Sequence, residues 1–79
     1  MATELEIMGA ILHLRDELRS GHALEIVRQA GLTNADVARI IGVSAPTVWF
    51  YFNSERRPRR ATALRLVKLL GTLEVVLSD

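Results

Sequence analysis

Apolar residues recur along the chain every three or four positions, which is the spacing of one face of an α-helix. The first such segment runs from about Thr3 to Arg19, and Ser20 with Gly21 ends it. Its main stripe consists of Ile7, Ile11, Leu14 and Leu18. Leu5, Met8 and Leu12 widen the apolar face beyond one buried stripe. We therefore expect this helix either to form a dimer contact or to cover the core of its own chain.

Residues 33–53 predict two short helices joined by a turn at Gly42. Thr33 is a good N-cap for the first helix and Ser44 for the second, because each side chain can accept a hydrogen bond from a free backbone N–H. Gly42 can adopt the left-handed conformation that ends a helix. Pro46 disfavours helical geometry at the residue before it, so the second helix is expected to start one residue late. The expected inward positions are Val37, Ala38, Ile40, Ile41, Val48, Tyr51 and Phe52.

A shorter apolar-faced helix precedes this pair, from about Leu24 to Ala30, and Gly31 ends it. After the pair, residues 53–60 form a loop by composition, in which Pro58 blocks helix continuation.

The closing part of the chain predicts a helix that begins at Thr62 and ends at Gly71. Its expected buried stripe is Leu64, Val67, the stem of Lys68 and Leu70, with Leu66 and Leu69 left for a second contact. Residues 72–77 then predict a short last helix. A strand is the alternative, because Leu73, Val75 and Leu77 alternate with other residues.

The spacing of three residues in the central pair is typical of a DNA-binding helix-turn-helix: a small Ala38, a glycine four positions later, and Val48 six beyond that. The chain resembles more closely the Cro/repressor-type (XRE-like) family. The residues that carry the resemblance are Gly31-Leu-Thr, Val37-Ala38, Ile41-Gly42-Val43-Ser44, Thr47-Val48 and Ala63-Leu-Arg-Leu-Val-Lys-Leu-Leu-Gly71. They span most of the chain, from about Leu24 to Leu77.

The resemblance implies an all-α, lambda repressor-like helical bundle in a single domain, residues 1–79. Residues 1–20 would be an additional N-terminal helix and residues 33–53 the helix-turn-helix. It also implies a sequence-specific repressor that binds double-stranded DNA as a homodimer on an inverted-repeat operator. The two reading helices would then enter successive major grooves about 34 Å apart. Regulators of this family that are so small typically come from a phage, plasmid or other mobile element, so the resemblance implies that origin.

Matching positions in the family contact bases and phosphates. By the resemblance, the DNA-contacting residues here are Asn34, Ser44, Ala45, Pro46, Thr47, Trp49, Phe50, Asn53, Arg56, Arg57, Arg59 and Arg60. Thr47 and Asn53 can each hydrogen-bond a base or a phosphate, and Ala45 can touch a thymine methyl.

Trp49 and Phe50 depart from the family, which more often has polar or basic side chains at these positions. One interpretation is apolar contact with thymine methyls and sugars, with the indole N–H donating to a phosphate. The alternative is that one ring, Phe50 rather than Trp49, packs into the core or a dimer seam.

The net charge is only +1 and by itself says little about a nucleic-acid partner. The distribution of charge along the chain says more. Residues 1–40 hold four Arg and six acidic groups, a balance of −2, whereas residues 41–79 hold five Arg, one Lys and three acidic groups, a balance of +3. A run of arginines is usually a solvated surface. Beside a helix-turn-helix it indicates contact with DNA phosphates.

Other classes of function receive little support. The absence of Cys excludes disulfides and thiolate metal sites. The two histidines, His13 and His22, are too few to predict a metal site, and we expect them to be solvated or capping. We expect no metal, no cofactor and no small-molecule ligand. No nucleophile–base pair or phosphate-binding Gly loop indicates an enzyme.

No apolar run has the roughly 18 residues of a membrane span, and we expect a cytoplasmic, bacterial protein. The alternative function is a protein-interaction module, such as the antitoxin half of a toxin–antitoxin pair. In that case Trp49 and Phe50 would be protein contacts. Binding that weakens steeply with salt would favour DNA.

Overall fold

The structure is a computed structural model, and it describes residues 2–78. These residues form five α-helices and no strand. The helices are α1 (Glu4–Ser20), α2 (His22–Gln29), α3 (Asn34–Ile41), α4 (Ala45–Phe52) and α5 (Arg60–Leu77). The prediction of an all-α fold is confirmed, and the alternative of a strand at the end of the chain is wrong.

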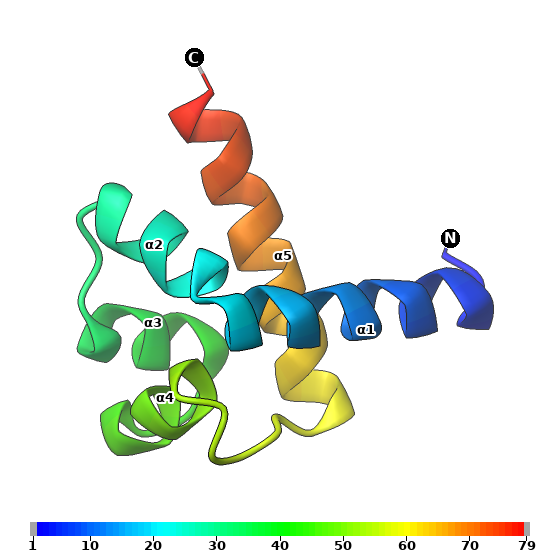
Figure 1. Cartoon of the computed structure of the whole chain (residues 1–79), viewed down its shortest axis with the longest axis horizontal. Helices are drawn as coiled ribbons and strands as arrows, with labels where there is room; N and C mark the ends of the chain where they lie inside the picture. Colours follow the sequence, from blue (N-terminus) through cyan, green and yellow to red (C-terminus); the bar gives the residue numbers. More distant parts are fainter. Residues whose placement is uncertain (1, 79) are drawn as a thin grey trace.

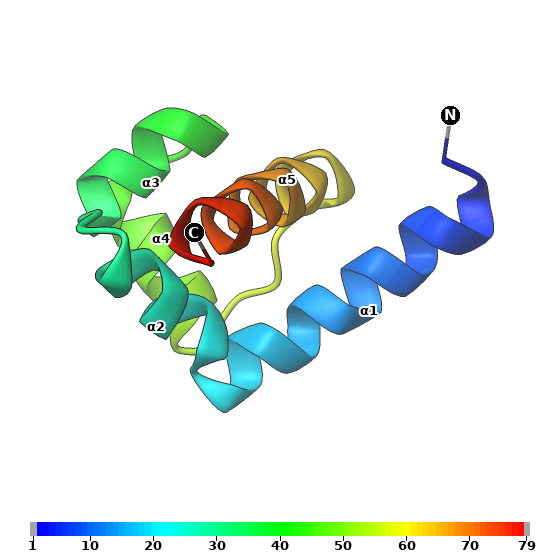
Figure 2. The same cartoon turned by 90° about the horizontal axis from the view of Figure 1, so that it is seen from above.

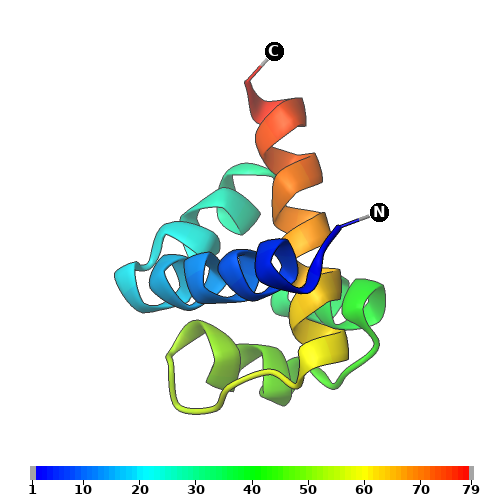
Figure 3. The ribbon, with the colours of Figure 1, turned by 90° about the vertical axis from the view of Figure 1, so that its right-hand side faces the viewer.

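Helix α5 runs through the molecule, and the other helices are arranged around it (Figure 1). Helix α1 crosses α5, while α2, α3 and α4 lie together on one side. Seen from above, the N-terminal half of α1 extends away from α2, α3 and α4 (Figure 2). The C-terminal part of α5 projects at the end of the molecule opposite α4 (Figure 3). Every helix contributes to one buried cluster, which includes Leu14, Val27, Val37, Val48 and Leu66.

Helices α3 and α4 start at the capping residues predicted from the sequence. The Thr33 side chain accepts a hydrogen bond from the Asp36 backbone N–H, and the Asp36 carboxylate accepts one from the Thr33 N–H. These two bonds complete a capping box. Hydrogen bonds from the backbone N–H and the side chain of Thr33 to the Asp36 carboxylate lower the pKa of Asp36 below its usual value. Ser44 caps α4 by accepting from the Thr47 N–H.

Gly42 ends α3 in the left-handed conformation, with φ at +78°. Its N–H and that of Val43 both donate to the Ala38 carbonyl, at 2.8 and 3.0 Å. Two backbone donors are thus satisfied within a turn of only three residues, so α4 starts at a defined angle to α3.

The closing helix differs from its prediction at both ends. Helix α5 begins at Arg60 rather than at Thr62 and continues through Gly71 to Leu77. Gly71 lowers helix propensity by about 1 kcal/mol relative to Ala. Leu70 before the glycine is buried, and Leu73 after it is half-buried. Both pack on the core, and this packing keeps the helix continuous. Propensity is a weak local effect that tertiary burial overrides.

The buried stripe of α5 was predicted correctly only at Leu70, which is buried. The other buried residues are Ala63 and Leu66, whereas Leu64, Val67 and Leu69 are only half-buried and Lys68 is exposed. The many leucines of this helix make two neighbouring faces equally apolar. Sequence periodicity could not choose between them.

Two expectations for the central helices were wrong as well. Ile40 is 53% exposed instead of buried, because the inward face of α3 is defined by Val37, Ala38 and Ile41. Pro46 does not delay α4, which begins at Ala45. Proline lacks only an N–H that the first turn of a helix leaves unpaired, so it fits there.

Gly42 provides a test of how far the turn depends on a residue without a side chain. Substitution Gly42→Ala forces a β-carbon into the left-handed region and places it 3.3 Å from Arg65 Nη1. We expect the free energy of unfolding to fall by about 1–2 kcal/mol. Urea denaturation monitored by circular dichroism measures this change.

The matched control is Gly71→Ala, where an added β-carbon meets no atom within 4 Å in an ordinary helical conformation. We expect this variant to be more stable than the unmodified protein, by roughly 0.5–1 kcal/mol. If Gly42→Ala were as stable as Gly71→Ala, the turn would not require a left-handed residue.

Candidate nucleic-acid interface

Helix α4 has one face in the core and the other in solvent. Val48, Tyr51 and Phe52 are buried, as predicted from their spacing. On the outward side, Trp49 is 47% exposed and Pro46 is exposed, while Ala45 packs half-buried against the core. An exposed indole at the outward face of a short helix is uncommon unless it meets a partner. This face is therefore the first part of a candidate interface.

The start of α4 carries two hydroxyls that contact each other. Ser44 Oγ and Thr47 Oγ1 are 2.7 Å apart, so one of them donates to the other. The second hydroxyl keeps its own hydrogen for an outside acceptor. One hydrogen-bond donor at the N-terminus of α4 thus remains available for a phosphate or a base.

Phe50 contacts both an aromatic ring and a cation. Its ring meets the Trp49 ring in an edge-to-face arrangement, with centroids 5.2 Å apart and an interplanar angle of 82°. The Arg56 guanidinium lies over the Phe50 ring, 4.8 Å from its centroid. Among the described residues, the core and the side chains packed on it do not include Phe50. The alternative that Phe50 fills the core is therefore wrong.

Two asparagines predicted to contact DNA are partly engaged within the chain. Asn53 ends α4, and its Nδ2 donates to the Trp49 carbonyl at 2.8 Å. Asn34 is the first residue of α3, and its Oδ1 accepts a hydrogen bond from Arg28 Nη2 at 2.8 Å. Asn53 keeps a free carbonyl oxygen and Asn34 a free amide group, so each can make only part of the contacts of an unengaged asparagine.

The basic loop after α4 divides into two parts. Arg56 and Arg57 line a hollow of about 220 Å³ together with Arg15 and Arg19 from α1. The ion pairs among residues 2–78 include Arg19 with Asp16, but neither Arg56 nor Arg57. Four guanidinium groups surround this hollow, and three of them, Arg15, Arg56 and Arg57, form no ion pair within residues 2–78. They make it a region of strong positive potential.

Arg60, predicted as a phosphate contact, points elsewhere. Its Nη2 is 2.5 Å from Glu4 Oε1, which joins the start of α5 to the start of α1. This hydrogen bond and the attraction between the two charges lower the pKa of Glu4 and raise that of Arg60. Arg59 is exposed and serves as the N-cap residue of α5. The structure thus groups Arg56 and Arg57 but places Arg60 with α1.

Sequence reasoning missed the contribution of α1 to this hollow. Arg15 and Arg19 are four residues apart, so both lie on one side of the helix. That signal was visible, but nothing in the local pattern showed that this side would face the loop after α4. The Tyr51 and Ser54 side chains also line the hollow.

A helix-turn-helix domain family model matches residues 13–78, which is most of the chain. The chain belongs to this helix-turn-helix family, of the XRE/Cro type. The match begins inside α1, so only residues 1–12 precede it. No curated protein and no solved structure matches the chain significantly.

Membership in the family indicates a DNA-binding regulator, and such domains are typically not enzymes. The helix-turn-helix is formed by α3, the Gly42 turn and α4. Within residues 2–78, no helix combines the length and the apolar character that crossing a membrane requires.

Proposed function

We propose that this protein is a sequence-specific repressor that binds double-stranded DNA as a homodimer on an inverted-repeat operator. One observation carries the proposal: the outward part of α4 lies next to Arg56 and Arg57, which form no ion pair within residues 2–78. Helix-turn-helix proteins place this helix in the major groove. Arginines beside it then reach the DNA backbone, where the guanidinium fork matches phosphate oxygens.

The side chains divide into those suited to bases and those suited to phosphates. Thr47 and Trp49 lie on α4 and would meet base edges, thymine methyls and sugars. Arg56, Arg57 and Arg15 surround the hollow beside the end of α4 and would meet phosphates. Arg56 can do this while it contacts Phe50, since its flat face meets the ring and its edge carries the N–H donors.

The N-terminal half of α1 is the proposed dimer contact. Leu5, Met8 and Leu12 are 80%, 59% and 53% exposed and lie along one side of the helix. Ile11, Leu14 and Leu18 on another side already cover the chain's own core. Gly9 lies beside Met8 with no atom within 4 Å of its would-be β-carbon, which leaves room for close approach of a second helix.

In the proposed dimer the α1 helices of two copies pack on each other through these exposed apolar side chains. A dimeric operator requires the two α4 helices to lie about one turn of DNA apart, roughly 34 Å. The longest dimension of the molecule, 32 Å, is of that size.

The proposal is tested by selecting bound sequences from a random duplex pool at two salt concentrations. We expect an inverted-repeat motif with half-sites about one helical turn apart, and binding that weakens steeply with salt. A folded protein that enriches no sequence would contradict the repressor proposal and favour a protein-interaction module.

On the selected operator, Arg57→Ala and Trp49→Ala should have different effects. Loss of the Arg57 phosphate contact should weaken binding to all sequences roughly tenfold, about the effect of one charge-assisted hydrogen bond. It should also reduce the slope of log affinity against log salt by about one unit. Trp49→Ala should instead change the preference among operator variants. Fluorescence anisotropy over a salt series measures all three quantities.

Lys68→Ala is the matched control for charge, because it removes one exposed positive group from the middle of α5. It should leave the salt slope unchanged. A Trp49→Ala protein with unaltered affinity and unaltered preference would show that Trp49 does not contact bases.

The dimer contact is tested by Met8→Glu, which places a charge at the centre of the exposed face of α1. We expect a dimer to become a monomer, with affinity for the full operator reduced more than affinity for a half-site. Sedimentation velocity gives the oligomeric state. The control is Val76→Glu on α5, where the valine is 61% exposed. If Met8→Glu, Val76→Glu and the unmodified protein all dimerised equally well, the dimer contact would lie elsewhere than on this face of α1.

The same exposed face of α1 supports the second candidate function, a protein-interaction module such as an antitoxin. In that case α1 would bind a different protein, and Met8→Glu would abolish that complex without changing the oligomeric state. A monomeric unmodified protein that also selects no DNA sequence would favour this candidate.

A further inference from the structure

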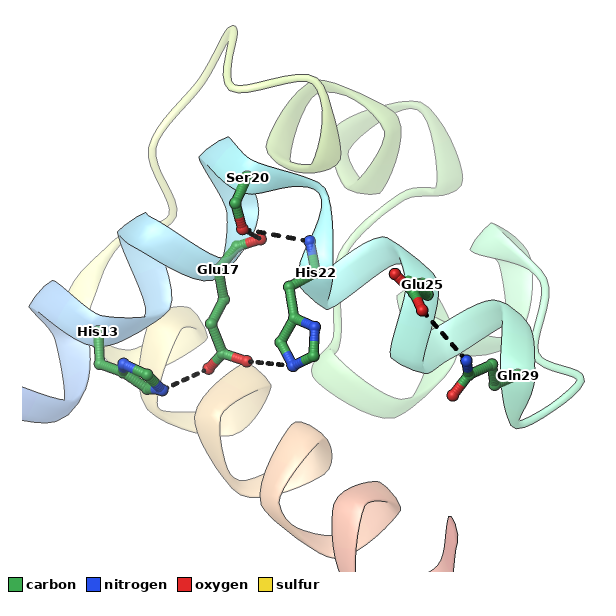
Figure 4. A network of polar contacts seen from close by, with 6 residues as sticks. All are labelled: His13, Glu17, Ser20, His22, Glu25 and Gln29. Carbon is green, nitrogen blue, oxygen red and sulfur yellow. Dashed lines mark hydrogen bonds and ion pairs between the residues drawn. The ribbon is translucent and has the colours of Figure 1, made fainter.

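Glu17 of α1 is the one buried charged side chain among the described residues, with 8% of its surface exposed. Its two carboxylate oxygens face two imidazoles (Figure 4). Oε1 is 3.1 Å from His13 Nε2, and Oε2 is 3.7 Å from His22 Nε2. No arginine or lysine within residues 2–78 forms an ion pair with it. A buried carboxylate is costly without a compensating cation, and a bound metal ion would provide one at this place.

A third helix brings another carboxylate to this place. One oxygen of Glu74 from α5, one oxygen of Glu17 and one nitrogen of His22 all lie within 4.8 Å of one another. Glu74 and Glu17 also line a hollow of about 160 Å³, with His13 at its side and Val67 and Leu70 among its apolar walls. Helices α1, α2 and α5 therefore direct one imidazole and two carboxylates at a common point.

The donor set selects the class of ion. Zn²⁺ binds imidazole nitrogen and carboxylate oxygen at about 2.0–2.2 Å, which places tetrahedral ligand atoms roughly 3–4 Å from one another. His22 and Glu74 are exposed, and small rotations of their side chains close the remaining distance. Mg²⁺ and Ca²⁺ take oxygen ligands, so a site that includes imidazole disfavours them.

We propose that Glu17, His22 and Glu74 bind a divalent transition metal of the Zn²⁺ class, with His13 beside Glu17 as a further ligand. The ion neutralises the buried carboxylate and joins α1 to α2 and α5. Glu74 belongs to the end of α5 that lies away from α4 (Figure 1), so the site is separate from the proposed DNA contacts. Its role is to fix α1 against α2 and α5, and this proposal stands whether or not the protein represses.

The sequence interpretation expected no metal because it counted only two histidines. Glu17 is four residues after His13 on one helix face, and His22 follows the Gly21 turn. The missing ligand, Glu74, is 52 residues further along the chain than His22, so only the fold could add it.

The test uses the full chain without a histidine tag, freed of metal with a chelator that is then removed. The melting temperature is measured with ZnCl₂ and, separately, with MgCl₂, and calorimetry gives the Zn²⁺ affinity. We expect Zn²⁺ at a hundredfold excess over its Kd to raise the melting temperature by roughly 10 °C, and Mg²⁺ to have no such effect. Substitution of Co²⁺ should give the visible absorption of a low-coordinate site.

The exposed ligands provide the variants, His22→Gln and Glu74→Gln, which leave the core unchanged. Each should reduce Zn²⁺ affinity by tenfold or more and remove most of the shift in melting temperature. Glu25→Gln is the control, since Glu25 lies on α2 and contacts Gln29 instead (Figure 4).

Two outcomes would overturn the proposal. In the first, Zn²⁺ shifts the unmodified protein no more than Mg²⁺ does, which means that Glu17, His22 and Glu74 do not bind the ion. In the second, the Zn²⁺ shift persists in His22→Gln and Glu74→Gln, which means that the ion binds at another place.

Discussion

The orientation of α4 relative to α3 depends on how α3 ends. The Ala38 carbonyl accepts two backbone N–H groups, from Gly42 and Val43, and this is feasible because Gly42 is left-handed. Ala38 itself is 5% exposed, and its small side chain lets the two helices approach closely. Once this turn is formed, Val48 and Tyr51 enter the core and the opposite side of α4 must face solvent. The exposure of Trp49 is thus a consequence of packing on the other face of a short helix.

The same packing explains why the candidate interface combines aromatic and basic side chains. Phe50 lies at the border between the core side and the outward side of α4, half-buried, with Trp49 against one side and Arg56 against the ring face. The contact with Phe50 orders the first arginine of the loop next to α4. An ordered arginine loses less conformational entropy when it meets a phosphate.

Helix α1 is joined to the rest of the molecule by both apolar and polar contacts. Leu14 and Leu18 are buried in the common core, and Glu4 pairs with Arg60 at the start of α5. Glu17 adds a buried charge close to α2 and α5, which is a costly feature unless a cation accompanies it. Because α1 also lines the basic hollow, its placement affects the charge that surrounds the end of α4.

The sequence by itself determined the helical fold and the helix-turn-helix. Those features rest on local signals: the caps Thr33 and Ser44, the glycine at 42, and the inward spacing of Val48 and Tyr51. Such signals act between residues a few positions apart, so a single sequence displays them. The exposure of Pro46 and Trp49 on α4 followed from the same periodicity, whereas Ala45, expected to face outward, packs half-buried against the core.

Only the tertiary structure decided which apolar face of α5 is buried, whether Gly71 ends a helix, and which arginines lie together. Each of these outcomes depends on contacts between residues far apart in the chain. Arg15 reaches the hollow beside Arg57, and Arg60 pairs with Glu4 at the far end of the sequence. Packing also brings together Glu17, His22 and Glu74, which come from three different helices. Local pattern sets what each helix can bury or present, and packing among the five helices selects among those options.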